Sequence, residues 1–239
     1  MPHSTLDIKE VARLLGLDAR DAARMAQRGQ IPCRKVGGDF LFNRAEIIEW
    51  LQQRVGDMAH EHLIDVDQAM GQHRDTAEHE PVLAELLHRA GVTPALQART
   101  KGSVLRALVD LADATGLLWD AEGLLAAVEE REDLCATALE GGIAIPHPRR
   151  PLPYSAAQPL LVVARTTSGI PFGAPDGRLT DLFFFTCSQD DRHHLHVLAR
   201  LCRIVRDDSV VTRLRAAQTA EEMIDAIRQA ESVLIGQPD

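Results

Sequence analysis

The chain has 239 residues, of which 45% are hydrophobic, and carries a formal net charge of −9 at pH 7. Its length predicts two units of unequal size, and its apolar content is sufficient for a sizeable core. No apolar run approaches the roughly 18 to 20 residues of a membrane span. Because Met1-Pro2-His3-Ser4 begins no signal peptide, we expect a soluble cytoplasmic protein without membrane insertion.

The negative charge is unevenly distributed along the chain. Residues 1–55 hold nine Lys and Arg against seven Asp and Glu, whereas residues 57–80 hold one Arg against seven acids. Such a step in charge predicts a boundary between two parts of the protein.

The cysteines are widely spaced and form no CxxC pair, which argues against a zinc site or a disulfide framework. We therefore expect reduced thiols in the core, with a structural role in packing. The residues concerned are Cys33, Cys135, Cys187 and Cys202.

Two short helices are predicted at the start of the chain. An apolar stripe over residues 8–15 predicts a helix that ends at Gly16. Asp18 can cap a second helix, which ends at Gly29. Two short helices joined by so brief a link are typical of a helix-turn-helix.

A hairpin and a third helix are predicted next. Residues 35–42 place the turn Gly37-Gly38-Asp39 between two short apolar stretches, which predicts a small hairpin or wing. Asn43, with Glu46 three residues later, resembles a capping box for a helix over residues 47–55.

These elements resemble the excisionase/MerR-type winged helix-turn-helix module over residues 6–51, through the motifs EVARLLG, RGQIP, KVGGDFLF and EIIEWL. The resemblance implies that the second helix, residues 18–28, lies in a DNA major groove. Asp18 and Asp21 place negative charge at the helix end that should face DNA, so the alternative is a fold kept for dimerisation or protein contacts. The basic residues expected to contact DNA are Arg20, Arg24, Arg28, Arg34, Lys35 and Arg44.

Residues 56–80 carry acids, scattered histidines and few large apolar residues, which predicts a solvated helical or flexible linker. The histidines have no compact ligand spacing, so we expect no metal site among His60, His62, His73 and His79. The expected organisation is a helix-turn-helix domain over 1–55, an acidic linker over 56–80 and a larger domain over 81–235.

The larger domain alternates between helical and strand-like patterns. Helices are predicted over 82–87, from Ser103 onward, and over 119–132, 195–205 and 220–230. Short strands are predicted over 143–145, 160–166 and 181–187. Interleaved helices and buried strands predict an α/β fold, with a mixed sheet flanked by helices.

The segment Gly141-Gly142-Ile143-Ala144-Ile145-Pro146-His147 has the pattern of a tight turn and a short buried strand that present one histidine. An imidazole can act as a nucleophile, a proton carrier or a metal ligand, so the segment alone leaves its chemistry open. Arg131 lies at the end of an earlier amphipathic helix, and residues 190–195 open a later one. The start of that later helix is a natural place for an anion.

Three motifs extend this pattern: REDLCATALEGGIAIPH (131–147), DDRHHLHVLARL (190–201) and VVTRLRAAQTAEEMIDAI (210–227). Over about residues 81–230 the chain resembles the IIA component of the fructose/mannitol class of the bacterial phosphotransferase system. Within that class it resembles the nitrogen-related regulatory branch.

The resemblance implies that His147 accepts a phosphoryl group, that His194 hydrogen-bonds this group and that Arg131 is the charge partner. It implies supporting positions at Thr137 and Asp176, no cofactor, and a histidine phosphocarrier protein (HPr-like) as partner. We expect His147, His194 and Arg131 to share one shallow surface pocket.

Other interpretations of these residues are open. Arg131 can be an ordinary surface arginine, and His194 can be a structural helix cap. Zinc on His193, His194 and His196 is disfavoured, because successive helical positions do not converge on one ion. Phe183-Phe184-Phe185 lies within an apolar run, which favours a buried strand over a platform for nucleotide stacking.

Three functional hypotheses follow. The first is a regulator that is phosphorylated on His147 and binds DNA through its N-terminal module, with a homodimer expected because such modules commonly read two half-sites. The second is a IIA-fold module that contacts regulatory target proteins without phosphotransfer. The third is a phosphocarrier for sugar uptake, which is disfavoured because the chain shows no sugar-translocating segment.

Overall fold

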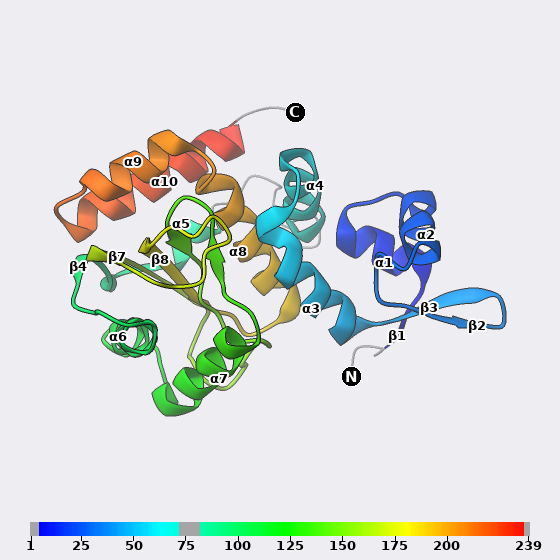
Figure 1. The fold of residues 1–239 in the computed structure, drawn as a ribbon, viewed down its shortest axis with the longest axis horizontal. Helices are drawn as coiled ribbons and strands as arrows, with labels where there is room; N and C mark the ends of the chain where they lie inside the picture. The colour runs from blue at the N-terminus through cyan, green and yellow to red at the C-terminus, as the bar shows by residue number, and fades with distance from the viewer. Residues whose placement is uncertain (1–4, 72–81, 237–239) are drawn as a thin grey trace.

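The computed structural model describes residues 5–71 and 82–236 (Figure 1). Its N-terminal part combines three helices with a small antiparallel sheet of order β1-β3-β2. The elements are β1 (Thr5–Leu6), α1 (Ile8–Leu15), α2 (Ala19–Gln27), β2 (Arg34–Val36), β3 (Asp39–Asn43) and α3 (Arg44–Arg54), followed by the 3₁₀ turn η1 (Val55–Asp57) and α4 (His60–Gly71).

Residues at the helix starts and in the hairpin turn determine where these N-terminal elements begin and end. The Asp18 carboxylate accepts hydrogen bonds from the first backbone amides of α2, and the Asn43 side chain does the same for α3. Between β2 and β3, Gly37 and Gly38 have φ angles of 60° and 100°. A two-residue hairpin turn of this twist needs positive φ at both positions, which glycine adopts without strain.

The larger part of the chain contains a mixed five-stranded sheet of order β4-β7-β8-β6-β5. Its strands are β4 (Leu87–Leu96), β5 (Ala138–Leu139), β6 (Ile143–Ala144), β7 (Leu160–Ile170) and β8 (Thr180–Cys187). The helices are α5 (Leu83–Leu86), α6 (Lys101–Asp113), α7 (Ala121–Leu134), α8 (Asp191–Ile204), α9 (Asp208–Ala216) and α10 (Ala220–Gly236). The predicted fold class, a mixed α/β sheet with helices beside a small helix-turn-helix region, is confirmed.

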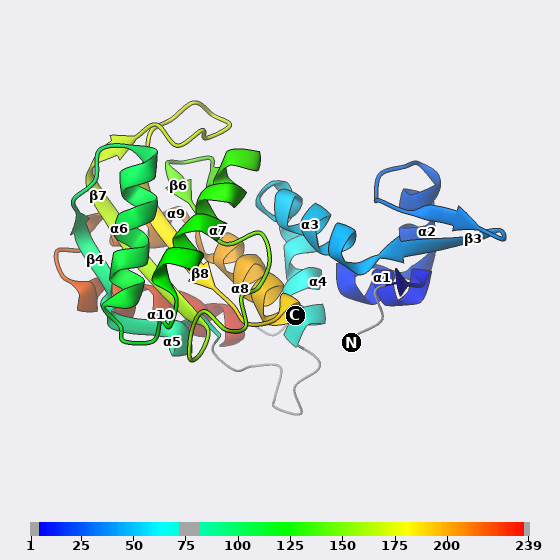
Figure 2. The same ribbon diagram turned by 90° about the horizontal axis from the view of Figure 1, so that it is seen from below.

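Helices cover both faces of this sheet (Figure 2). Val162 and Phe185, which are paired across β7 and β8, pack toward α6 and α7. The neighbouring pair Val163 and Phe184 packs on the opposite face with α8 and α10. Because both faces are covered, the middle of β8 is apolar, and Phe183–Phe185 form a buried strand as the sequence predicts.

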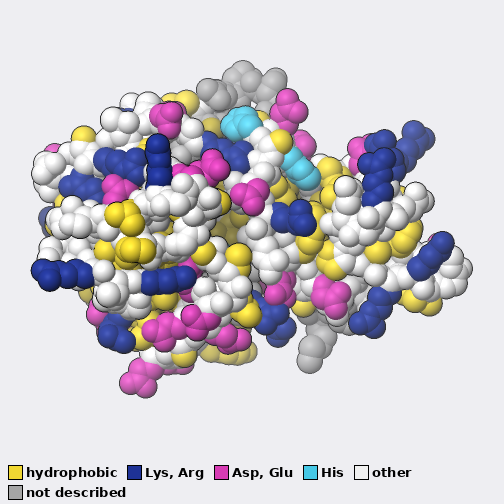
Figure 3. Space-filling model, viewed as in Figure 1, with side chains coloured by type: hydrophobic (Ala, Val, Ile, Leu, Met, Phe, Trp, Pro, Cys, Tyr) yellow, Lys and Arg dark blue, Asp and Glu magenta, His cyan; other side chains and the backbone are white. Residues whose placement is uncertain are grey.

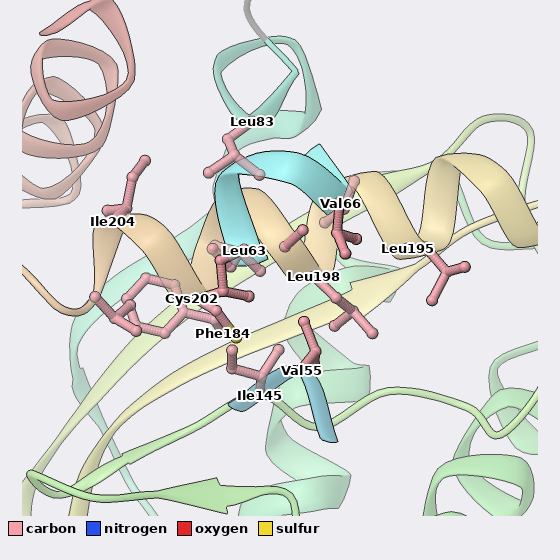
Figure 4. Close-up of a cluster of buried hydrophobic side chains, with 14 of the residues drawn as sticks. Val55, Leu63, Val66, Leu83, Ile145, Phe184, Leu195, Leu198, Cys202 and Ile204 are labelled. Carbon is pink, nitrogen blue, oxygen red and sulfur yellow. The ribbon is translucent and has the colours of Figure 1, made fainter. Parts of the chain in front are cut away.

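The N-terminal elements share one apolar core with α8 and the sheet face beneath it. In Figure 1, α8 lies between the sheet and helices α3 and α4. Leu63 and Val66 of α4 point toward Leu198 and Cys202 of α8 (Figure 4). Residues 60–71 are therefore a packed helix, so the helical form of the prediction agrees with the structure but the predicted solvation is wrong over this segment. Residues 72–81, with His73, His79 and the expected boundary at 80/81, lie outside the described residues.

Buried charges join α4 to α8 and α10. Arg200 Nε of α8 donates to both carboxylate oxygens of Asp67, at 3.0 and 2.8 Å, and its Nη1 lies 3.3 Å from Glu231 Oε1. His196 Nε2 lies 3.0 Å from Asp67 Oδ1. Burial pushes the pKa of Asp67 upward, but the hydrogen bond from His196 and the charge of Arg200 outweigh it, so the pKa is lowered. The Glu231 carboxylate also accepts from the backbone amides of Val82, Leu83 and Ala84.

Two other predictions need correction. The sequence predicts a helix through Leu87, whereas α5 ends at Leu86 and β4 begins. Gly91 and Pro94 obscure this strand in the sequence, and Pro is tolerated because β4 lies at the sheet edge. Cys187 and Cys202 are buried, and burial raises the pKa of each to about 12. Cys135 is exposed and Cys33 half-buried, so the predicted core location is wrong for Cys135.

No helix among residues 5–71 and 82–236 has both the length and the apolar character needed to cross a bilayer.

We predict that Arg200→Ala lowers the free energy of unfolding by about 3–5 kcal/mol, because two buried carboxylates lose their shared counter-charge. Urea unfolding followed by circular dichroism measures the change. Arg228→Ala on α10 is the matched control, since its pair with Asp225 is exposed and such pairs contribute about 0–1 kcal/mol. Equal losses in the two variants would contradict a structural role for the buried pair.

Candidate functional site

A short hairpin positions His147. Strands β5 and β6 pair antiparallel, and the turn between them contains Gly141 and Gly142, with φ angles of 81° and 80°. A Cβ atom at Gly142 would also lie 2.9 Å from the Leu179 carbonyl oxygen. Glycine is therefore required at this position both for its conformation and for the available space.

Two interactions fix this turn from outside the hairpin. Asp176 Oδ2 accepts a hydrogen bond from the Gly141 amide at 2.9 Å, and this bond is the main reason that the pKa of Asp176 is lowered. Arg215 Nη2 donates to the Gly141 carbonyl at 2.6 Å and pairs with Asp181. Sequence reasoning missed Arg215, although it lies within the third motif. Asp176 thus holds the turn that leads to His147.

Hydrogen bonds to the sheet hold the backbone that precedes His147. Strand β6 pairs parallel to β8, and the Thr186 amide donates to the Pro146 carbonyl at 3.1 Å. His147 therefore follows the carboxyl end of β6 in a fixed position.

The His147 ring has a defined tautomer. Its Nδ1 lies 2.7 Å from the Ile145 carbonyl oxygen, which only accepts hydrogen bonds, so Nδ1 carries the proton. Its Nε2 is buried and has no hydrogen-bond partner. Burial lowers the pKa of His147 well below 6.5, and the neighbouring His194 and the positive charge of Arg131 lower it further. Near neutral pH the ring is neutral, with a free electron pair on Nε2.

His194 lies beside His147 in the first turn of α8. Asp190 caps this helix through the amides of Arg192 and His193. The two imidazole rings have centroids 5.1 Å apart and are tilted by 57°. Neither nitrogen of His194 has a partner, and burial, followed by the charges of His193 and Arg131, lowers its pKa to about 3. His194 is therefore also neutral.

The site is closed. His147 is only 3% exposed and His194 only 1%, so the expected shallow surface pocket is wrong. Arg131, in the last turn of α7, is also buried, and its Nη1 donates to the Cys135 carbonyl at 2.7 Å. Its charge acts on both imidazoles. The structure thus brings the three predicted residues together, but inside the protein.

Thr137 is held by a residue that sequence reasoning did not single out. Its hydroxyl donates to Glu132 Oε2 at 2.5 Å, and its amide donates to the same carboxylate. Lys101 Nζ pairs with Glu132 at 2.8 Å. Glu132 follows Arg131 directly, so the arrangement ties the end of α7 to the strand pair that precedes His147.

The neighbouring histidines have separate partners. His193 Nδ1 lies 3.3 Å from Ser188 Oγ, and His196 contacts Asp67 on α4. Within the described ranges, no group of three or more His, Cys, Asp or Glu side chains is arranged to hold a metal ion.

Most of the expected DNA contacts are exposed on the N-terminal part. Arg20 and Arg24 lie on α2 and Arg28 directly follows it, while Arg34 and Lys35 lie on the wing. Figure 3 shows Lys and Arg side chains along the outer edges of this part. Arg24 pairs with Asp21 of the same helix. Arg44 differs, because its Nε lies 3.5 Å from Asp191 Oδ2 at the start of α8.

Family models match two regions of the chain. Residues 85–230, more than half of the chain, match the model described as "Phosphoenolpyruvate-dependent sugar phosphotransferase system, EIIA 2". Residues 5–55 match a helix-turn-helix domain. The expected pairing of a IIA domain with an N-terminal helix-turn-helix is confirmed.

Curated relatives support this assignment. The nitrogen regulatory protein of Escherichia coli (strain K12) is 30% identical over 159 residues, covering 66% of this chain and 93% of that protein. The fructose-specific EIIABC component of Bacillus subtilis is 26% identical over 149 residues, covering 62% of this chain. The match spans only 23% of that longer protein.

Solved structures share the fold. Nitrogen regulatory protein IIA-Ntr from Neisseria meningitidis has a TM-score of 0.51 at 23% identity, covering 62% of this chain and 99% of that one. IIA mannitol from Escherichia coli has a TM-score of 0.52 at 21% identity, covering 59% and 98%. A complex of enzyme IIA mannitol with phosphorylated enzyme IIB mannitol from Escherichia coli has a TM-score of 0.53 at 20% identity, covering 60% and 97%.

We predict that the buried neutral histidines destabilise the fold in mild acid. The pKa of His147 is lower in the folded chain than in the unfolded one, so protons bind preferentially to the unfolded state below pH 6.5. His147→Gln should remove about 1.4 kcal/mol per pH unit from the slope of unfolding free energy between about pH 6 and 5.

Urea titrations at several pH values measure that slope. His60→Gln, which removes an exposed imidazole from α4, is the matched control. An unchanged slope in His147→Gln would show that the ring is not held neutral by burial.

Proposed function

This chain belongs to the phosphoenolpyruvate-dependent sugar phosphotransferase system EIIA 2 family, and on that premise we propose that it is a phosphoryl-accepting regulatory protein. His147 accepts the phosphoryl group from a histidine phosphocarrier protein, and the helix-turn-helix domain binds DNA. The observation that carries the proposal is the neutral His147 ring, protonated on Nδ1 with Nε2 free, beside His194 and Arg131. Family membership and the nature of this donor support a cytoplasmic location.

The transfer is an in-line displacement between two imidazoles. The Nε2 electron pair of His147 attacks phosphorus, and an Nε2–P bond forms as the N–P bond of the donor breaks. The donor ring is protonated on its second nitrogen, so it leaves as a neutral imidazole with the electron pair of the broken bond. The His147 proton stays on Nδ1, hydrogen-bonded to the Ile145 carbonyl.

The neighbouring residues stabilise the negative charge on the phosphoryl oxygens during transfer. The Arg131 guanidinium supplies positive charge for the transferring oxygens, and a ring nitrogen of His194 supplies a hydrogen bond. Thr137 and Asp176 act indirectly, by holding the strand and the turn before His147. Each group is in position before the donor arrives, which limits reorganisation during transfer.

The N-terminal domain supports the regulatory part of the proposal. An excisionase/MerR-like module would place α2 in a major groove, with Arg20, Arg24 and Arg28 along it. Arg34 and Lys35 of the wing would contact phosphates. A protein with this pairing of domains would control transcription. As a homodimer it would bind two DNA half-sites. Regulatory target proteins are further partners that the alternative hypothesis requires.

Incubation of the full chain with a ³²P-labelled histidine phosphocarrier protein tests phosphotransfer. We predict acid-labile, base-stable label on the wild type, none on His147→Gln, and a rate about 10²-fold lower for His194→Gln, which loses a donor to the transferring group. His60→Gln is the control and keeps the wild-type rate.

A folded wild-type chain that gains no label would overturn the proposal. That result would favour the module that contacts partner proteins without phosphotransfer, an interpretation to which the burial of His147 gives some support. Rapid transfer onward to a sugar-specific IIB protein would instead favour the uptake carrier.

DNA binding has a separate test. We predict that Arg34→Ala and Lys35→Ala each weaken binding to a non-specific DNA duplex and each reduce the slope of log affinity against log salt by about 1, since each removes one phosphate contact. Fluorescence anisotropy over a salt series measures both quantities. Arg106→Ala on α6 is the control for losing one exposed positive charge. Unchanged slopes in both wing variants would contradict DNA contact by the wing.

A further inference from the structure

The closed site raises a steric problem for any phosphodonor. An in-line transfer requires the donor phosphorus to reach Nε2 of His147, yet His147 is 3% exposed and His194 is 1% exposed. A part of this chain therefore has to leave before a donor protein can approach.

Helix α3 of the helix-turn-helix domain contacts both of the chain segments that carry the two rings. At its start, Arg44 pairs with Asp191, three residues before His194. In its middle, Glu49 Oε2 accepts a hydrogen bond from Arg149 Nη2 at 2.7 Å, two residues after His147. The two contacts therefore tie α3 to the segment beside His194 and to the segment beside His147.

The turn after α3 continues the contact beneath the site. Val55 lies beside Ile145 and Leu198 (Figure 4), and Ile145 is the residue whose carbonyl binds the His147 ring. A Cβ atom at Gly56 would lie 2.5 Å from Leu139 Cδ2 on β5. The surface that α3 and the following turn contact, here called the seat of α3, thus extends from the start of α8 to the hairpin that positions His147.

Gln52 lies between these contact residues in the sequence. It is three residues after Glu49 and four before Gly56, so it shares the helix face that both of these residues present to the larger domain. Its side chain is buried, and both polar atoms of its amide have no hydrogen-bond partner. Nε2 of His147 and both nitrogens of His194 are in the same state. Each such atom costs about 1–3 kcal/mol, so these unpartnered polar atoms oppose the closed state, whereas the apolar contacts and ion pairs of α3 favour it.

We propose that α3 is a lid over the phosphorylation site, so that the helix-turn-helix domain and the phosphodonor occupy this face in turn. This inference rests on the proposed function of His147. When α3 leaves, Nε2 of His147 becomes accessible and Arg149 is released from Glu49. A phosphoryl group on His147 then opposes the return of α3, because it adds bulk and about −2 charge where Glu49 has to dock.

The lid also predicts whether phosphorylation of His147 raises or lowers the affinity for DNA. Arg44 is paired with Asp191 only while α3 is seated. Its release adds a sixth basic residue to the five exposed ones expected to contact DNA. The phosphorylated chain therefore binds DNA more tightly than the unmodified chain.

A reversible disulfide tests the lid directly. A Cβ atom at Gly56 would lie 3.9 Å from Leu139 Cγ, and replacing Leu139 with Cys removes the crowding Cδ2 atom. The pair Gly56→Cys and Leu139→Cys is thus within disulfide reach, in a Cys33→Ser, Cys135→Ser background that removes the more accessible native thiols. We predict that the oxidised form is phosphorylated by the labelled phosphocarrier at least tenfold more slowly than the same protein after reduction. Gly56→Cys alone, oxidised identically, is the control.

A second pair of variants does not depend on a disulfide. Glu49→Lys places a positive charge against Arg149 and should raise the phosphorylation rate several-fold. Glu46→Lys makes the same charge change at an exposed position of α3 and should not. Equal rates in the oxidised and reduced forms, or no difference between the two lysine variants, would overturn the lid and leave phosphotransfer intact. Absence of label from the wild-type chain under every condition would overturn the proposed function itself.

Discussion

The contact of Arg200 with the carboxylates of Asp67 and Glu231 joins three separate parts of the chain. Each charge alone would be costly inside the protein, and together they are tolerable only when all three helices are in place. The contact therefore fixes α8 relative to both α4 and α10. Since α8 carries His194 in its first turn, the same constraint that assembles the fold determines where the second imidazole lies. It also keeps the N-terminal domain against the larger one.

The chemistry of the site follows from burial. A solvent-exposed imidazole is partly protonated near neutral pH and is then unable to attack phosphorus. Burial keeps His147 and His194 neutral, and the Ile145 carbonyl selects the tautomer with Nε2 free. Arg131 contributes in the same direction, because a nearby positive charge disfavours a second one. On the proposed function, the enclosure that keeps His147 neutral also separates it from its donor, and the proposed lid resolves this conflict.

Sequence reasoning succeeded where a local pattern determines the structure and failed where distant partners do. The caps at Asp18 and Asn43, the Gly37-Gly38 turn and the apolar strand at Phe183–Phe185 depend on a few adjacent residues. The resemblance to the IIA family predicted that His147, His194 and Arg131 act together although Arg131 and His194 are 63 positions apart in the sequence. The structure places the two rings side by side, and the charge of Arg131 acts on both. The acidic composition of residues 60–71 predicts a solvated segment. In the structure, however, Asp67 is buried and paired with Arg200, which lies far away in the sequence. The burial of the site could not be predicted from the sequence either, because it depends on how distant parts of the chain pack together.

Linkage explains why a lid of this kind would transmit a signal. If seating α3 reduces the affinity of the site for a phosphoryl group by some factor, phosphorylation reduces the seating of α3 by the same factor. A coupling of 1–3 kcal/mol, about 5–150-fold, is within the range of allosteric proteins. A salt bridge at Glu49, a half-exposed pair at Arg44 and unpartnered polar atoms at Gln52 make the contact weak enough to be reversed by one modification. The stronger Asp67–Arg200 contact lies outside this seat, so α4 can keep the two domains tethered while α3 moves.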